Sequence, residues 1–560
     1  MSKYDLSHLL GPDTAVSTAA QQVVSPGASA AASGGVAYDG ARKANRLSMW
    51  RPPLRSADAD LLPEKGSLDA RVRDTFRNDA YVAGGASIFK DSIVGARYLL
   101  NSKPETKVLW GKEDPTWEIE FQEEVETKFT LWAESPQNWV DSARRNNFTA
   151  QVRLAVGLDL SGGEVLGLAN WMPDDGRPYR VALQYVDPDR LSTPFDRAVS
   201  VRIRNGVELD RRGAPIAYYI RNSHPSEGPF FDYSDLSAAK WSRVPARKAW
   251  GRPIVLHLFE QMRADQSRGV SSIATALSEM RMMKHFRQTE LERAVVAATY
   301  AASIESELPQ DVAAALGAGM NDAGNATTQW IEDYLNTLTE YTSNARNLHM
   351  DGAKIPIFAP GTSLKLQNPG AQGPVGDKFE QSLLRYVAAA LNVSYEQLSR
   401  DYTQTNYSSA RAAMGETQKT MATRKKRVAD ATADFVYRLW LEEAINYNQI
   451  EALKRRNVPK FYEGLNAEAY AACEWIGAGL GQIDPLKETQ AAILRVKSGF
   501  STKEIEISKM SGSDWRKISR QIQRERELDE YYGNPSIYDS TDTTDLENSL
   551  TAKPREGGEA

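Results

Sequence analysis

The feature that most constrains the fold is an apolar repeat in residues 408–446, where Met414, Met421, Val428 and Phe435 recur every seven residues. Such a repeat keeps the four side chains on one face of an α-helix. No proline interrupts the stretch, so it predicts one helix with a length on the order of 55–60 Å. A stripe of this kind is typical of core packing rather than of a cofactor site.

Two further helical patterns, residues 269–300 and 376–392, enclose a mixed segment that contains Pro356, Pro360 and Pro369. Proline interrupts regular secondary structure, so this segment combines short helical and extended pieces. We interpret it as a compact insertion between two helices. The resulting order is helix, insertion, helix, polar stretch and long helix.

Basic residues form two groups on these predicted helices. Arg281, Lys284 and Arg287 recur every three residues, and the run RKKR extends from Arg424 to Arg427 inside the long helix. Charged runs on helices usually face water. We therefore interpret the first group as a solvated face and the second as a solvated or intersubunit face.

The polar stretch between the last two helices, residues 391–416, raises the question of catalysis. Ser408 or Ser409 has the hydroxyl of a nucleophile, and Asp401 or Glu396 has the carboxylate of a general acid or base. A hydroxyl nucleophile needs a group that takes its proton, and no His or Cys lies in this stretch. A loop that touches a passing partner through hydroxyls and amides is the alternative.

The region before the helices, residues 41–265, is predicted to be an α+β domain. Residues 68–100 and 116–147 have helical patterns, whereas residues 152–172 suggest two strands joined by a turn at Gly162 and Gly163. Further strands follow, with a turn at the pair Asn205-Gly206. His257 lies on one of these strands, where a lone histidine is more often a hydrogen-bonded core residue than a ligand.

Helix caps mark the remaining boundaries. Ser394, three residues before Gln397, has the spacing of a capping box and predicts a helical turn inside the polar stretch. Asp484 before Pro485 predicts the start of a helix, and Ser501, with a glutamate three residues later, caps the next one. Residues 465–530 are therefore a small helical domain. The Ala-, Ser- and Gly-rich residues 1–40 and the acidic residues 531–560 are predicted to be flexible tails.

Composition excludes several classes of protein. The single cysteine, Cys473, excludes an internal disulfide, and the five histidines show no metal-binding spacing, so we expect no metal and no cofactor. The chain has no phosphate-binding loop, dinucleotide fingerprint or nucleophile elbow. It has neither a secretory signal nor an apolar run long enough for a membrane, which predicts a soluble protein with no membrane partner. A net charge of -5 argues against binding nucleic acid by bulk positive charge.

Six segments, in one order, resemble the portal proteins of tailed bacteriophages, specifically the lambda-type family. They are RNDAYVAGGASIFKDSIVG (77–95), NGVELDRRGAPIAYYI (205–220), VLHLFEQMRADQSRGVSS (255–272), YAASIESEL (300–308), FEQSLLRYVAAALNVSYEQLSRDYTQTNYSSARA (379–412) and EWIGAGLGQIDPLKETQ (474–490). No single segment is a chemical motif, but their collinear order over most of the chain is specific. Departures are concentrated in the two tails and in residues 310–345.

The resemblance implies a ring of identical subunits, dodecameric in the capsid, at one vertex of the phage head. Double-stranded DNA is packaged and ejected through such a ring, which binds terminase, major capsid and scaffold proteins, and the head-completion or tail connector proteins. The protein is then part of the virion, and of the host cytoplasm during assembly. The implied regions are an N-terminal arm (1–40), wing (41–265), stem helices (266–300 and 376–392), clip (301–375), tunnel loop (393–407), long wing helix with its connection (408–464), crown (465–530) and C-terminal tail (531–560).

The same resemblance assigns site residues. The tunnel loop would contact DNA through Arg400, Tyr402, Thr403, Gln404, Thr405 and Asn406. The stem residues that would face the channel are Arg281, Lys284 and Arg287. Each phosphate neutralised by Lys or Arg strengthens DNA binding, so a loop of mainly neutral groups suits a conduit that must not trap its cargo.

Two alternatives from other classes remain. One is a structural head-to-tail adaptor that is not itself a portal, and the other is a hydrolase or nuclease that uses Ser408, Asp401 and Glu396. An enzyme has no need of a ring with a central bore, so particle images distinguish these alternatives. We expect a protein that is not an enzyme.

Overall fold

The structure is a computed structural model, and it describes nine ranges and two single residues of the chain. These are residues 49–173, 175–197, 202–227, 240–300, 348–350, 353–355, 375–403, 405–481 and 484–534, with residues 336 and 538. The expected arm (1–40), most of the expected clip (301–375) and most of the expected tail (531–560) lie outside the described residues, as does Gln404. The chain divides into two compact units, Met1–Arg55 and Ser56–Ala560, and the elements below belong to the second.

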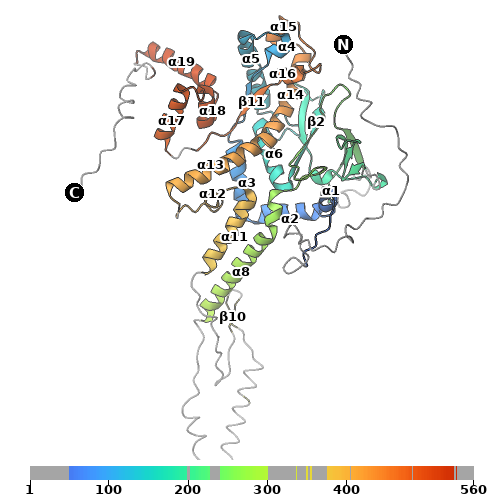
Figure 1. The fold of residues 1–560 in the computed structure, drawn as a ribbon, viewed down its shortest axis with the longest axis vertical. Helices are drawn as coiled ribbons and strands as arrows, with labels where there is room; N and C mark the ends of the chain where they lie inside the picture. Colours follow the sequence, from blue (N-terminus) through green and yellow to red (C-terminus); the bar gives the residue numbers. More distant parts are fainter. Residues whose placement is uncertain are drawn as a thin grey trace, which may run out of the picture. The chain divides into compact units, whose positions relative to one another are not determined.

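The first part of this unit is mainly helical (Figure 1). Its helices are α1 (Ala57–Leu61), α2 (Lys65–Asn78), α3 (Ala80–Ile93), α4 (Thr106–Trp110), α5 (Pro115–Ala133) and α6 (Phe148–Gly162). The helical prediction for residues 68–100 is therefore right for α2 and α3, which Asp79 separates by capping α3. The predicted helix over 116–147 is α5, but it ends at Ala133.

Helix α6 corrects the sequence prediction. Apolar residues alternate from 152 to 160, which suggested a strand before Gly162 and Gly163, but this segment is helical. Val152, Val156 and Leu160 are buried at the spacing of one helical turn. Gly163 ends the helix with a φ of 73°, a left-handed conformation that glycine adopts without strain. The alternation also involved Leu158, which packs against the core, and Leu154, which is exposed.

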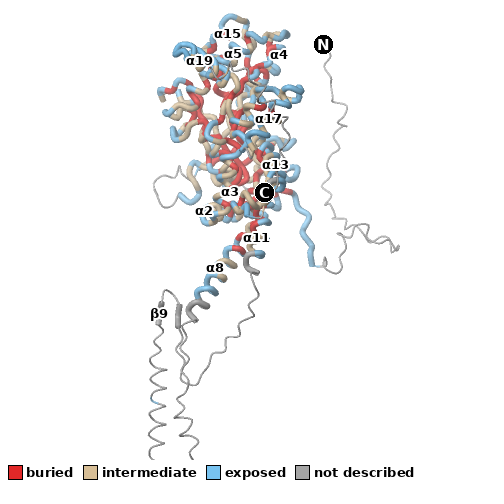
Figure 2. The backbone as a smooth tube through the Cα atoms, turned by 90° about the vertical axis from the view of Figure 1, so that its left-hand side faces the viewer, coloured by how far each residue is buried: buried red, intermediate tan, exposed pale blue. Residues whose placement is uncertain are grey.

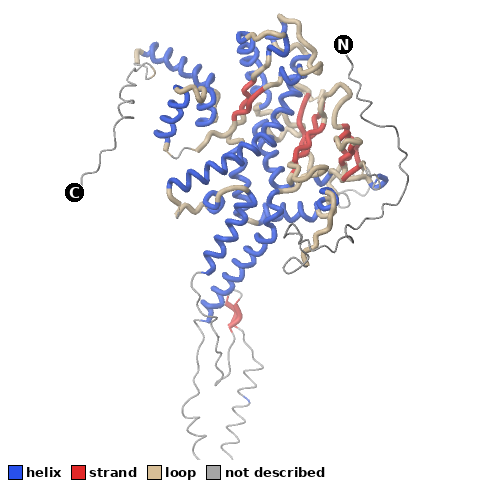
Figure 3. The backbone as a smooth tube through the Cα atoms, in the orientation of Figure 1, coloured by secondary structure: helices blue, strands red, loops and turns tan. Residues whose placement is uncertain are grey.

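Two antiparallel sheets follow (Figure 3). The first has the order β3-β2-β8 and the second the order β4-β5-β6-β7, and a small apolar cluster packs beside β2 of the first and β5 and β6 of the second. The strands are β2 (Glu164–Trp171), β3 (Val181–Tyr185), β4 (Ile203–Arg204), β5 (Val207–Leu209), β6 (Pro215–Arg221), β7 (Trp241–Pro245) and β8 (Val255–Phe259), with short 3-10 turns η4 (Pro188–Arg190) and η5 (Phe195–Arg197). The predicted turn at Asn205 and Gly206 is confirmed, since both have a positive φ, of 44° and 87°.

A helix pair leads away from the sheets (Figure 1). The 3-10 turn η6 (Ser272–Ala276) opens into α8 (Leu277–Tyr300), and α11 (Val375–Leu391) packs beside α8 on its return. The small strands β9 (Leu348–Met350) and β10 (Ala353–Ile355) pair with each other between the two helices in sequence. The polar stretch contains α12 (Tyr395–Ser399), which Ser394 caps as predicted.

The long helix is confirmed, with one irregularity. It consists of α13 (Tyr407–Arg424), the π-helical turn η7 (Lys425–Asp430) and α14 (Ala431–Asn446). Of the predicted stripe, Met421, Val428 and Phe435 are buried. Most of α14 belongs to the main core, and α13 is much more exposed (Figure 2).

The RKKR run does not form a solvated face, so this part of the prediction is wrong. Arg424 is 7% exposed and stacks on Phe89, and Arg427 binds both carboxylate oxygens of Asp159 at 3.0 and 3.1 Å. Lys425 donates to the carbonyl oxygen of Trp475. The π turn widens the helix here, and three of the four cations lie against the neighbouring elements. Lys426 alone of the four is strongly exposed, at 76% of its side chain.

The C-terminal elements are one strand, β11, and five helices among the described residues. Strand β11 (Cys473–Ile476) pairs with β1 (Leu99–Ser102). The other elements are α15 (Glu451–Lys454), α16 (Asn466–Tyr470), α17 (Pro485–Lys497), α18 (Lys503–Ser511) and α19 (Trp515–Tyr532). Asp484 caps α17 as predicted, but Thr502 rather than Ser501 caps α18. Within the described ranges, no helix has the length and apolar character needed to cross a bilayer.

Candidate nucleic-acid interface

The polar loop between α12 and α13, residues 400–406, is held by its own short hydrogen bonds. Arg400 ends α12 in the left-handed conformation, with a φ of 57°. Asp401 accepts hydrogen bonds from the backbone N–H and the hydroxyl of Thr403, at 3.0 and 2.6 Å. Asn406 caps α13 by accepting from the backbone N–H of Ser409 at 2.8 Å. On either side of Gln404, the described residues of the loop thus form hydrogen-bonded turns.

The loop presents neutral groups to solvent. Tyr402 is 55% exposed, and Arg400, Thr403 and Asn406 are also exposed, whereas Thr405 is half-buried. The one acid among the described loop residues, Asp401, is engaged by Thr403, whose hydroxyl and N–H hold the pKa of the Asp401 carboxyl below its usual value. An incoming polyanion therefore meets hydroxyls, an amide, one guanidinium and the ionised, hydrogen-bonded carboxylate of Asp401.

The candidate nucleophile and base of the enzyme alternative lack a shared arrangement. The hydroxyl of Ser409 donates to Asn406, and Asp401 is taken by Thr403. Glu396 lies in the first turn of α12, and Ser408 is exposed in the first turn of α13. A carboxylate of lowered pKa that already accepts two hydrogen bonds is a weak general base.

The three basic residues predicted to face a channel have different surroundings. Arg287 donates to Glu380 of α11 through Nε at 2.9 Å and stacks on Tyr81 of α3, with its guanidinium 4.8 Å from the ring centroid. Its charge is therefore matched within the chain. Arg281 and Lys284 are exposed and border a groove between α2 and α8.

A fully buried ionic cluster, which the sequence analysis did not identify, lies where the helix pair leaves the sheets. Its centre is Glu164, the first residue of β2, which is 0% exposed. Arg268 reaches this carboxylate through Nε at 2.9 Å and Nη2 at 2.6 Å. His257 and Lys65 lie 3.1 and 3.2 Å from it, and the backbone N–H of Gly269 donates to it at 3.2 Å. His257 is thus a hydrogen-bonded core residue, as predicted.

The Glu164 cluster, defined as Lys65, Asp69, Glu164, His257 and Arg268, joins several elements. Arg268 also donates to the backbone carbonyls of Pro188, Leu191 and Asn205. Lys65 of α2 binds Asp69 at 2.9 Å and donates to the carbonyl of Gly269 at 2.9 Å. Burial favours the neutral form of Glu164, but the charges of Arg268 and Lys65 outweigh it and hold the pKa of Glu164 well below its usual range.

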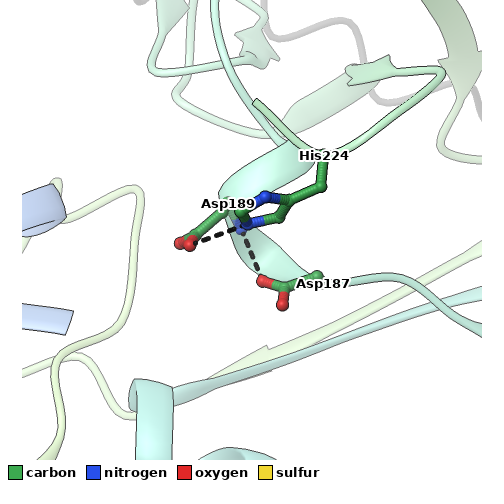
Figure 4. A group of neighbouring side chains, drawn as sticks. All are labelled: Asp187, Asp189 and His224. Carbon is green, nitrogen blue, oxygen red and sulfur yellow. Dashed lines mark hydrogen bonds and ion pairs between the residues drawn. The ribbon is translucent and has the colours of Figure 1, made fainter. Parts of the chain in front are cut away.

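One group in the described part of the chain has the spacing of metal ligands, namely Asp187, Asp189 and His224 (Figure 4). His224 lies 3.3 Å from Asp189. However, Arg73 of α2 binds Asp189 through both terminal nitrogens and also approaches Asp187. Burial acts to raise the pKa of Asp189, and Arg73 outweighs it and lowers this pKa. The guanidinium already supplies the positive charge that a metal ion would bring.

Comparison with known proteins identifies the family. The model of the phage portal protein, lambda family, matches residues 43–425. The chain belongs to the lambda family of phage portal proteins. The portal protein of Escherichia phage N15 is 35% identical over 482 residues, which are 86% of this chain and 87% of that protein. Portal protein B of Escherichia phage lambda is 35% identical over 483 residues, with the same shares. The function of the present chain is accordingly that of a portal at the capsid vertex of a tailed phage.

More distant relatives also match. A probable portal protein of Halomonas phage phiHAP-1 is 22% identical over 512 residues, which are 89% of this chain and 88% of that protein. Among solved structures, the neck of a native gene transfer agent particle computed with C12 symmetry has a TM-score of 0.37 and 13% identity, covering 79% of this chain and 92% of that chain. The neck of the empty particle computed with C6 symmetry has a TM-score of 0.40 and 14% identity, with the same coverage.

Proposed function

We propose that this portal protein assembles into a ring, dodecameric in the capsid, and that double-stranded DNA passes through its bore. The observation that carries this proposal, beside the family, is the loop of residues 400–406. It presents Tyr402, Thr403 and Asn406, and its two charged groups, the guanidinium of Arg400 and the carboxylate of Asp401, are of opposite sign. Neutral hydrogen-bonding groups contact phosphates without the strong, salt-dependent attraction that each Lys or Arg adds.

The regions of the chain have corresponding roles in this proposal. Residues 41–265 form the wing together with the long helix and its connection (408–464). Helices α8 and α11 form the stem, residues 393–407 the tunnel loop, and residues 465–530 the crown. Because β11 pairs with β1, the helices that we assign to the crown begin at Pro485. Residues 301–375 form the clip, where terminase docks first and the connector proteins dock later.

The remaining proposed partners are the major capsid and scaffold proteins. We place the subunits in the host cytoplasm during assembly and in the virion afterwards. Portal proteins are structural proteins of the particle, which supports a role without catalysis. A head-to-tail adaptor is the second candidate, and images of a ring incorporated in the head before the tail joins would favour the portal.

Adding positive charge to the tunnel loop tests the conduit. In the variant Gln404→Lys/Thr405→Lys we expect rings to form but DNA movement to slow, because each phosphate contact adds about 0.9 to the salt slope of binding. The measurement is packaging yield over a salt series, with ring formation checked by electron microscopy. The defect should shrink as salt rises. A packaging yield equal to that of the unchanged protein at low salt would show that this loop does not face DNA.

Removing the candidate nucleophile tests the absence of catalysis. We expect Ser408→Ala to package DNA at a yield within about twofold of the unchanged protein, because the Ser408 side chain is an exposed hydroxyl and alanine is a better helix former. Particles that carry this variant are compared with unchanged particles by their DNA content. Intact rings that no longer support packaging would return the enzyme alternative to first place.

A further inference from the structure

The stem pair of α8 and α11 exposes large apolar side chains on two different sides. On α8, Met282 is 54% exposed and Leu291 is 67% exposed. They are nine residues apart, about two and a half helical turns, so they lie on opposite sides of the helix. Apolar side chains that gather into an exposed patch mark candidate interaction surfaces, so each side of α8 is described with its neighbours.

The first side is aromatic. Phe286, one turn after Met282, packs edge-on against Phe379 of α11, with ring centroids 5.0 Å apart. Tyr386, seven residues after Phe379, continues the same stripe along α11. Phe379 is 40% exposed and Tyr386 is 48% exposed. We call Met282, Phe286, Phe379 and Tyr386 the aromatic side of the stem.

The second side contains a groove. Leu277, Lys284 and Leu291 recur every seven residues, so they form one stripe of α8. Beside the N-terminal part of this stripe, α2 and α8 enclose a groove of about 550 Å³. Its lining includes Asp74 and Asn78 from α2 and Leu277, Arg281 and Lys284 from α8. We call this stripe with its groove the groove side. It is large enough for an aromatic ring and has polar groups for a phenol hydroxyl.

The two sides are matched in height along the stem. Phe379 contacts Phe286, and the long side chain of Arg287 reaches Glu380, so residues 379–380 of α11 lie beside residues 286–287 of α8. The helices run antiparallel, so Tyr386, seven residues further along α11, lies at the level seven residues before Phe286 on α8. That level is Glu279, between the groove residues Leu277 and Arg281.

We propose that Tyr386 of one subunit occupies the groove between α2 and α8 of the next subunit in the ring. The proposal deepens the proposed function and rests on it, since it needs a ring. Ring closure joins two different surfaces of the same chain, head to tail. Rotation about the ring axis leaves the height of every residue unchanged, so in a stem that runs along this axis Tyr386 lies at the same height as the groove of the neighbouring subunit.

This arrangement gives Arg281 and Lys284 a role other than facing the bore. They line the groove with Asp74 and Asn78, so they border the seam between neighbouring stems. The Tyr386 hydroxyl would meet these polar groups while its ring covers Leu277. Arg287 remains within its own subunit, because Glu380 and Tyr81 bind it there. The seam thus uses the aromatic side of one subunit and the groove side of the next.

Cysteine cross-linking tests the seam in assembled rings. The native Cys473 is first replaced in the full chain by Cys473→Ser, and the pair Arg281→Cys/Tyr386→Cys is added. We expect a short bis-maleimide to convert at least half of the subunits into covalent dimers and higher multimers, seen as a ladder in a denaturing gel. The matched control is Met282→Cys/Tyr386→Cys, in which the α8 cysteine is moved by one residue to the aromatic side. It should give no ladder.

The outcomes separate this proposal from the ring itself. Suppose that rings are visible by electron microscopy and yet give no ladder with the first pair, or an equal ladder with the control. Either result contradicts the placement of Tyr386 in the neighbouring groove and leaves the portal function intact. Subunits that form no ring at any salt or protein concentration overturn both. A ladder with the first pair alone supports the seam.

Discussion

The variant Arg268→Met is expected to lower the free energy of unfolding by about 3–5 kcal/mol, because it removes one partner of a buried ion pair and leaves the other charge uncompensated. Glu164 is 0% exposed, and Arg268 supplies its closest donor, at 2.6 Å. The change also removes the donor to the carbonyls of Pro188, Leu191 and Asn205. The measurement is urea unfolding of the purified protein.

Two variants make this expectation specific. Arg268→Met/Glu164→Gln removes the stranded charge and should recover on the order of 2 kcal/mol, a coupling typical of residues in one network. Arg263→Met removes an arginine from the same loop, but its pair with Asp60 is about half exposed, so the change should stay within about 0.5 kcal/mol. Equal effects of Arg268→Met and Arg263→Met would contradict the role of the Glu164 cluster.

The cluster also predicts a pH dependence. Arg268 and Lys65 hold the pKa of Glu164 well below its usual range, so its ionisation stabilises the fold above the pKa of the unfolded chain, about 4.3. This stability is lost as the pH falls through the folded pKa of Glu164. The Glu164→Gln variant should therefore lose less stability than the unchanged protein below about pH 4.

The sequence predicted the features that local chemistry determines. Asn205 and Gly206 form the expected turn because both adopt a positive φ, and Ser394 caps α12 through its own hydroxyl. The repeat of Met421, Val428 and Phe435 predicted the long helix because all three residues lie on that one helix, so their spacing reflects its local geometry. In the candidate site, the neutral character of residues 402–406 is visible from their residue types alone.

Features that depend on tertiary partners were missed. Lys65, Glu164 and Arg268 are each ordinary surface residues by type, and they meet only because the fold brings positions about 100 residues apart in sequence to one point. The run from Arg424 to Arg427 looked solvated for the same reason, because Asp159, which binds it, lies on another helix. Long-range pairing of charges leaves no periodic signal in one sequence.

The base of the stem depends on a contact between two glycine backbones. A Cβ atom at Gly163 would lie 2.0 Å from the carbonyl carbon of Val270, and one at Gly269 would lie 2.1 Å from the carbonyl oxygen of Gly163. Both distances are far below van der Waals contact, and the opposing atoms are backbone, which cannot rotate away. Gly163 also has a φ of 73°, which costs another residue roughly 1–2 kcal/mol.

We therefore expect Gly163→Ala to destabilise the chain by about 4 kcal/mol or more, at the upper end of single substitutions, and to reduce the yield of rings. The neighbouring residue provides the matched control. Gly162 ends α6 with nothing within 4 Å of an added Cβ, so Gly162→Ala should be neutral or stabilising by up to about 1 kcal/mol through helix propensity. Thermal unfolding and negative-stain images of both variants give the comparison. If Gly163→Ala forms rings with the melting temperature of the unchanged protein, the stem does not depend on this backbone contact. The two backbone segments would then have moved apart without a loss of stability.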